Sequence, residues 1–131
     1  MDDRTRARFD RELEWVLERL PERIHELIEE VPLHVEDHPS PRVMAELGVR
    51  RRNQLCGLYT GIPISERSIQ HSGQMPDVVT IFREGILAAA RGYDGRLRRD
   101  RLREEIRITV LHELAHHHGI DEDELWELGY G

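Results

Sequence analysis

The sequence contains no lysine, since all 19 of its basic residues are arginines. This absence excludes Schiff-base catalysis and any other chemistry that needs a lysine amine. Cys56 is the only cysteine, which excludes an intramolecular disulfide and a zinc site built from several thiolates. Because Cys56 lies in the apolar segment 55–58, we expect it to be a buried packing residue.

Long apolar runs are missing as well. No segment approaches the roughly 18 consecutive apolar residues typical of a transmembrane helix, and the charged start of the chain lacks the apolar core of a signal peptide. The formal net charge of −7 argues against a surface built to bind nucleic acid or an anionic membrane. We therefore expect a cytoplasmic protein, and the sequence leaves its oligomeric state open.

The composition is polar but globular, with 38% hydrophobic and 34% charged residues. A chain of 131 residues suits one domain, residues 1–131. Apolar residues at helical spacing predict two linked helices over residues 5–20 and 21–30, with Pro21 at the first position of the second helix. Further short helices are expected at residues 42–47, 84–91 and 122–128.

Segments with alternating or β-branched apolar residues predict three strands, at residues 32–36, 55–60 and 78–82. A long helix is predicted over residues 97–118, where apolar side chains recur on two flanks. Such a helix is expected to run through the middle of the domain and to end at Gly119. The fold class that follows is α+β, with a small β-sheet packed on one long helix.

The segment from His112 to His116 carries the chemistry that the sequence predicts. Histidines four residues apart on a helix lie one turn apart on the same face, with about 5–6 Å between their Cβ atoms. Two imidazoles at that spacing can bind one zinc ion at about 2.0–2.1 Å each. Glu113 is expected to reach a zinc-bound water and to act as general base. The sequence therefore predicts zinc-dependent amide hydrolysis at His112, Glu113 and His116.

A catalytic zinc ion needs a third protein ligand and one open position for water. The residues after the long helix offer Asp121 and Glu122 for this role. Asp121 is well placed to cap the next helix, with Glu124 three residues later as its capping-box partner. Glu122 would then be free to face the metal, so we favour Glu122 over Asp121 as the third ligand.

The donor that would stabilise the transition state stays open among Tyr59, His71, Tyr93, Tyr130 and several arginines. We expect Tyr59 and Tyr93 to be packing residues, whereas His71 lies in a polar loop of the kind that often overhangs a site. His117 is expected to pack or to support the ligands without binding the metal itself.

Several segments together resemble the mini-zincins, short bacterial proteins related to the zincin metallopeptidases. The resemblance rests on segments spread over about residues 8–127: Leu20-Pro21-Glu22, Val35-Glu36-Asp37, Leu58 to Pro63, Ser65-Glu66-Arg67, Pro76 to Phe82, Thr109 to His117 and Gly119-Ile120. The helix motif is similar to the aspzincin form, HExxHxxGxxD, which His112, Glu113, His116 and the following glycine match directly. Its aspartate position falls on Glu122, which keeps the carboxylate and lengthens the side chain by one methylene.

This resemblance implies a minimal zincin-like fold, with N-terminal helices, a small sheet packed on the active-site helix and a short C-terminal helix. It implies a zinc ion held by His112, His116 and Glu122, with Glu113 as the catalytic residue and a peptide or protein as the substrate. It also implies that the strand at residues 78–82 borders the substrate cleft, where an extended peptide binds by strand addition.

Two other functions stay open. The short chain favours a degenerate zincin that serves as a non-catalytic binding or scaffold protein. A metal-dependent endoribonuclease with the motif HGxLHxxGxDH has nearly the same spacing, and the arginines within residues 96–107 could contact phosphate. However, that family has glycine where this chain has Glu113 and histidine where it has Glu122, and the arginines alternate with acidic residues. We therefore expect no nucleic-acid partner.

Overall fold

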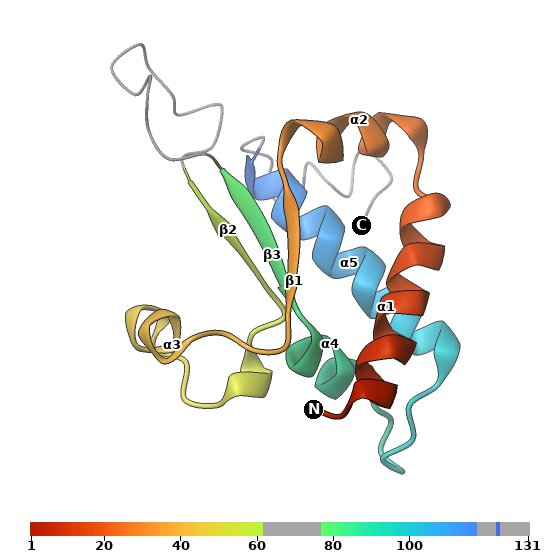
Figure 1. The fold of residues 1–131 in the computed structure, drawn as a ribbon, viewed down its shortest axis with the longest axis vertical. Helices are drawn as coiled ribbons and strands as arrows, with labels where there is room; N and C mark the ends of the chain where they lie inside the picture. The colour runs from red at the N-terminus through yellow and green to blue at the C-terminus, as the bar shows by residue number, and fades with distance from the viewer. Residues whose placement is uncertain (62–76, 118–122, 124–131) are drawn as a thin grey trace.

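The structure is a computed structural model, and it describes residues 1–61, 77–117 and 123. Within these residues the chain forms five α-helices, a 3-10 turn at Arg52–Gln54 and a three-stranded sheet (Figure 1). The helices are α1 (Asp3–Glu18), α2 (Glu22–Glu30), α3 (Pro41–Leu47), α4 (Arg83–Ala90) and α5 (Arg99–His117). The strands are β1 (Leu33–Glu36), β2 (Gly57–Thr60) and β3 (Val78–Phe82). The expected α+β fold, a small sheet packed against a long helix, is confirmed.

The boundaries of most elements differ from the predicted ones by one or two residues; α1, for example, was expected over residues 5–20 and spans Asp3–Glu18. Pro21 is the N-cap of α2 and not its first helical residue, because its ψ of 150° is extended. The helix α5 begins at Arg99 and not at residue 97, because Leu97 forms an isolated antiparallel bridge with Arg91. The strand β2 begins at Gly57, two residues later than predicted. The predicted cap at Gly119 and the predicted helix over 122–128 lie outside the described residues, apart from residue 123.

The order of the strands in the sheet is β1-β3-β2. The strand β1 pairs with β3 in parallel, from Leu33 opposite Val79 to Glu36 opposite Phe82. The strand β2 pairs with β3 in antiparallel fashion, from Gly57 opposite Ile81 to Thr60 opposite Val78. Both edges of β3 are therefore occupied by neighbouring strands.

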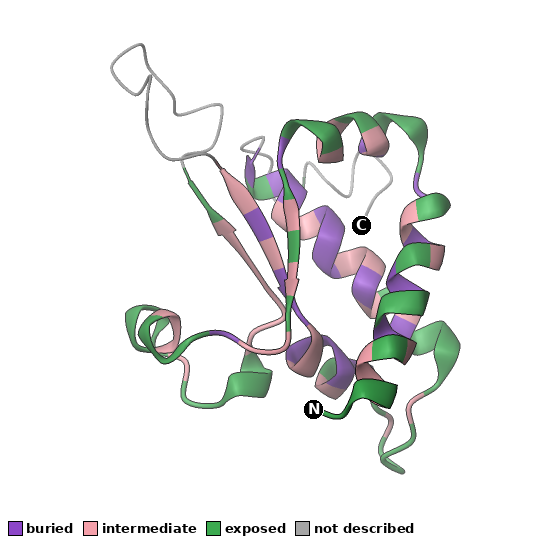
Figure 2. Cartoon of the chain, viewed as in Figure 1, coloured by how far each residue is buried: buried purple, intermediate pink, exposed green. Residues whose placement is uncertain are grey.

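This order corrects the expectation that the strand at residues 78–82 receives a substrate by strand addition. An added strand needs unpaired backbone N–H and C=O groups at the edge of a sheet. In β3 these groups bond to β1 on one side and β2 on the other. Its alternating side chains, Val79 and Ile81, are fully buried, as is typical of a central strand (Figure 2).

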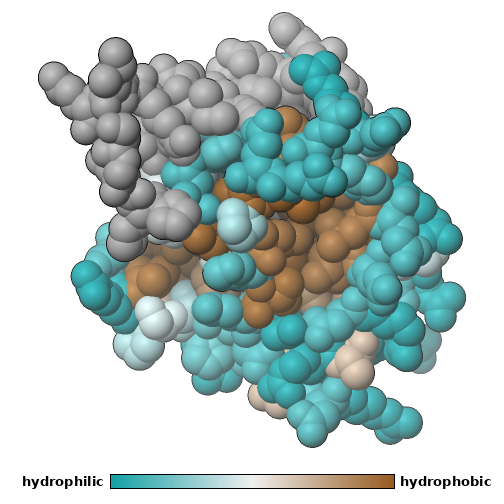
Figure 3. Space-filling view, turned by 45° about the horizontal axis from the view of Figure 1, so that its top comes forward, coloured by the Kyte–Doolittle hydropathy of each residue, from teal (hydrophilic) through white to brown (hydrophobic). Residues whose placement is uncertain are grey.

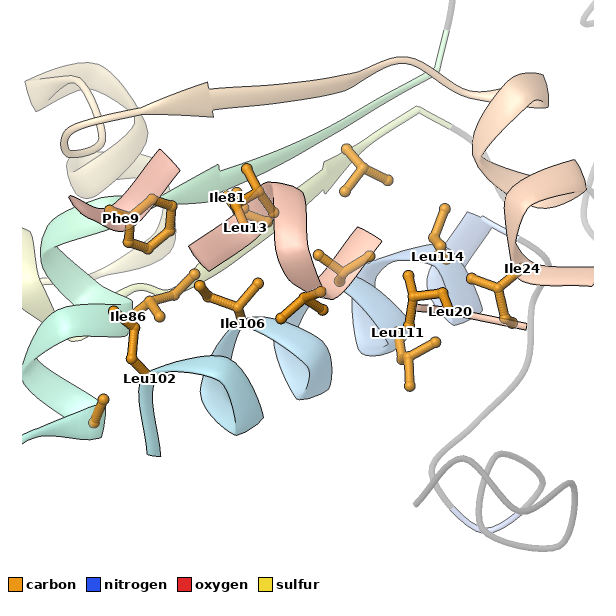
Figure 4. Packing of buried hydrophobic residues seen from close by; sticks show 14 of the residues in the cluster. Phe9, Leu13, Leu20, Ile24, Ile81, Ile86, Leu102, Ile106, Leu111 and Leu114 are labelled. Carbon is orange, nitrogen blue, oxygen red and sulfur yellow. The ribbon is translucent and has the colours of Figure 1, made fainter. Parts of the chain in front are cut away.

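The hydrophobic core is formed by side chains from α1, α2, β3, α4 and α5 (Figure 4). The largest contribution comes from α5, whose stripe of buried residues at helical spacing is Leu102, Ile106, Val110 and Leu114. Each fully buried aliphatic side chain of this size stabilises the fold by about 1.5–3 kcal/mol relative to exposure. The prediction that this helix runs through the middle of the fold is thus confirmed. No helix in the described part of the chain is both long and apolar enough to cross a membrane.

Some apolar side chains at the border of the core are only half-buried. They come from α1, α2 and β1 and pack against the buried cluster: Leu17, Leu27, Ile28, Leu33 and Val35. On the face of the molecule seen in Figure 3, apolar side chains gather in a central area that polar side chains surround. The core is therefore not closed on every side by the described residues.

A network of ion pairs joins the first helix to the sheet and to α4. Asp37, directly after β1, accepts hydrogen bonds from Arg6 of α1 at 2.7 and 3.2 Å. Arg83, the first residue of α4, donates to Asp37 at 3.0 Å and to Asp10 of α1 at 2.9 and 3.1 Å. The hydrogen bonds from Arg6, with the charges of Arg6 and Arg83, lower the pKa of Asp37 to about 2. The network therefore holds three elements together wherever Asp37 is ionised.

We expect the stabilisation from Asp37 to depend on pH in the acid range. Its pKa is lower in the folded protein than its ordinary value of 3.8, so the unfolded chain binds the proton more readily. The stabilisation is complete well above pH 4 and is lost as the pH falls towards about 2. Asp37→Asn should therefore be less stable than the wild type at pH 7, with a difference that shrinks on acidification. Urea unfolding across this pH range measures it, and a constant difference would contradict the assignment.

Candidate active site

The last two turns of α5 carry the residues expected to bind the metal. His112 and His116 are both within the helix, so they lie one turn apart on the same face. The helix is continuous through this segment. The hydroxyl of Thr109 also donates a hydrogen bond to the backbone carbonyl of Glu105 at 2.8 Å. The helical geometry that the motif requires is therefore present.

The two histidines differ in exposure. The side chain of His116 is 60% exposed, and that of His112 is half-buried. An exposed imidazole is hydrated at little cost, so burial gives no argument for a metal at His116. The exposure does leave its ring accessible to an ion from solution.

Glu113 is in contrast largely buried, with only 12% of its side chain exposed. Its Oε2 atom lies 3.4 Å from Nδ1 of His116 and makes no hydrogen bond to another described residue. Burial raises the pKa of Glu113, against the opposing effects of His116, His112 and a backbone hydrogen bond from Tyr59. A buried carboxylate that makes so few hydrogen bonds is suited to accept a proton from a bound water.

The strand β2 covers this carboxylate because it approaches α5 very closely at Gly57. A Cβ atom at this position would lie 2.9 Å from Cγ of Glu113 and 2.9 Å from Cγ2 of Thr109. Real Cβ atoms essentially never make contacts this short. Glycine therefore allows the strand to rest directly on the turn of α5 that carries Glu113.

A second pair of polar side chains is buried beside this turn. Nδ1 of His117 lies 2.9 Å from Oδ2 of Asp77, and the two side chains are 4% and 8% exposed. The ring of Tyr59 meets the ring of His117 edge-on, with 5.7 Å between centroids. We expected His117 to pack or to support the ligands, and its burial agrees with that role. Asp77 was missed, although it directly precedes the strongest strand pattern in the sequence.

The donor set fits a zinc ion as far as the described residues reach. Two imidazoles one turn apart are borderline-soft nitrogen ligands, which zinc prefers. No group of three His, Cys, Asp or Glu side chains with metal-binding geometry occurs within the described residues. The proposed third ligand, Glu122, and its alternative, Asp121, both lie outside them. The described part therefore contains two candidate ligands and the neighbouring carboxylate.

The other candidate residues have different surroundings. Tyr93 was expected to pack but is fully exposed in the turn after α4, so that expectation is wrong. Tyr59 is half-buried, as expected for a packing residue. Cys56 is half-buried against the core, and burial raises the pKa of its thiol. His71 and Tyr130, the remaining candidate donors, lie outside the described residues.

The arginines of α5 are largely engaged with other side chains. Arg103 binds Glu12, a buried carboxylate of α1, and Arg99 lies 3.6 Å from the same group. The guanidinium of Arg103 also stacks on the ring of Trp15, 3.5 Å from its centroid. These arginines are thus paired with a carboxylate and an aromatic ring of the protein itself, and Glu12 comes from α1.

A family model for zincin-like metallopeptidases matches residues 28–131, which include β1, the whole sheet and α5. No curated protein matches the sequence.

We expect Gly57→Ala to destabilise the protein and to displace Glu113. The added methyl group overpacks the contact between β2 and α5, which typically costs about 1–3 kcal/mol. Chemical denaturation measures the loss. The matched control is Gly92→Ala, where the close contacts of the new methyl group are with the movable ends of Arg98 and Asp94, and the nearest backbone atom is 3.9 Å away. Equal stability of the Gly57 variant and the wild type would show that β2 does not rest on Glu113.

Proposed function

Because the chain belongs to the zincin-like metallopeptidase family, we propose that it hydrolyses peptide bonds at a zinc site on α5. The proposed ligands are His112, His116 and Glu122, and the proposed catalytic residue is Glu113. The observation that carries this proposal is the buried carboxylate of Glu113, whose Oε2 atom lies 3.4 Å from the imidazole of His116. A helix of purely structural function gains nothing from burying an acid in this way.

Each residue has a defined task in the proposed reaction. A zinc ion bound here would act as a Lewis acid and lower the pKa of a water molecule to about 7. Glu113 takes the proton from the attacking water and later delivers it to the leaving amine. The backbone of Tyr59 and the covering strand β2 fix the carboxylate, so it needs no reorganisation during the reaction.

The sheet suggests where an extended peptide would bind. Within the described residues, β2 pairs only with β3, and its other edge has no strand partner. This strand also contacts α5 beside Glu113. We propose that β2, and not the central β3, offers its edge to the substrate by strand addition.

We expect Glu113→Gln to abolish hydrolysis and to leave zinc bound. Glutamine keeps the shape of the side chain but cannot accept the proton, and loss of a general base typically costs about 10²–10⁴-fold in rate. Elemental analysis of protein purified without added metal gives the zinc content, and mass spectrometry of a digested peptide library gives the activity. Glu104→Gln, an exposed change on the same helix, is the control.

The same measurements separate the alternatives. Stoichiometric zinc with no cleavage of any peptide by the wild type would favour a non-catalytic binding protein. Cleavage of RNA without cleavage of peptides would favour the endoribonuclease. A wild-type protein that contains no zinc, and takes up none on dialysis, would refute the metal site itself.

We expect Glu122→Ala to lose zinc and Asp121→Ala to retain it. A catalytic zinc ion with two ligands is bound far more weakly than one with three, whereas loss of a helix cap costs only about 0.5–2 kcal/mol of stability. Zinc content after dialysis against a weak chelator distinguishes the two variants. The reverse result would assign the third ligand to Asp121.

A further inference from the structure

The buried pair of Asp77 and His117 lies outside the set of residues assigned to the proposed site. Its two side chains come from different elements, since Asp77 directly precedes β3 and His117 is the last residue of α5. Their polar atoms are 2.9 Å apart, and both side chains are more than nine-tenths buried. A contact between two distant segments thus forms at the end of the active-site helix.

The end of β2 closes around the same pair. Gly61, directly after β2, has a φ of 140°, which disfavours other residues, and a Cβ atom there would lie 2.1 Å from Oδ1 of Asp77. The ring of Tyr59 packs edge-on against His117 from the same strand. The ends of β2, β3 and α5 are therefore held together at one point.

The helix relates this point to the proposed zinc ligands. Successive residues of an α-helix are rotated by about 100°, so His116 and His117 face different surroundings. The structure shows this directly, with 60% exposure for His116 and 4% for His117. A contact that fixes His117 in the interior therefore fixes the direction in which His116 faces solvent.

The cost of burial argues that this pair serves geometry more than stability. Burying a carboxylate and an imidazole is expensive, and apolar residues of similar volume often stabilise a protein as well or better. A polar pair accepts only a narrow range of distances and angles, whereas apolar packing tolerates sliding. Such a contact defines the rotation of the last turn of α5.

We propose that Asp77 is a positioning residue, which acts through His117 to set the last turn of α5 so that His116 meets the metal. This inference rests on the proposed zinc site. It assigns to Asp77 no contact with the metal or the substrate. Removal of the carboxylate is expected to weaken zinc binding by about 10-fold or more, the usual cost of losing a group that orients a ligand.

The experiment compares zinc dissociation constants, measured by competition with a chromogenic chelator, for the wild-type protein and three variants. Asp77→Ala removes the carboxylate. The double variant Asp77→Leu/His117→Phe replaces the pair by apolar side chains of similar size and is expected to fold. Asp94→Ala removes an exposed carboxylate whose partner is Arg98, 2.8 Å away, and serves as the control. Circular dichroism and thermal unfolding report whether each variant is folded.

The expected result is a folded double variant with wild-type thermal stability and zinc binding at least about 10-fold weaker, together with an unchanged Asp94→Ala. The visible spectrum of the cobalt-loaded double variant should also differ from that of the wild type. A folded Asp77→Ala or double variant that binds zinc as tightly as the wild type would overturn the inference. Loss of the native fold in both variants would also overturn it, because the pair would then serve stability alone. If the wild type itself fails to bind zinc, the result refutes the proposed zinc site and not the role of Asp77 alone.

Discussion

The contact between β2 and α5 is the constraint on which the candidate site depends. A strand can rest on a helix at van der Waals distance only where a side chain is absent, and Gly57 provides that gap opposite Glu113 and Thr109. The contact removes the carboxylate of Glu113 from most of the solvent and brings the backbone of Tyr59 within hydrogen-bond reach of it. An acid in this position is neither freely solvated nor fully paired, which is the condition that a proton-accepting group needs.

The last turn of α5 serves two purposes at once. One side faces the interior, where His117, Asp77 and the ring of Tyr59 join the helix to the sheet. The other side presents His116 to solvent. Because a helix is rigid over one turn, whatever fixes the inner side also determines the outer one. The proposed chemistry therefore depends on packing contacts made by residues that are not themselves proposed as ligands.

The rest of the fold keeps the sheet and α5 in place. The core joins α1 and α4 to α5. The ion pairs of Asp37 with Arg6 and Arg83 connect α1 and α4 to the end of β1. In a short chain the amount of apolar surface that can be buried is limited, so such part-buried pairs contribute a larger share of the connections. The described residues of the candidate site lie on or next to β2, β3 and α5, and the family model spans all three elements.

The sequence by itself determined the elements and the ligand spacing, because both follow from local rules. Helical spacing of apolar residues predicted α1, α2 and α5, β-branched residues predicted β3, and the interval between His112 and His116 placed them on one helix face. Only the tertiary structure decided that β3 is central, that Glu113 lies under Gly57, and that Asp77 reaches His117. Strand order and these contacts join residues 18 to 56 positions apart in the sequence. Their geometry depends on how the whole core packs, and no local pattern in the chain encodes it.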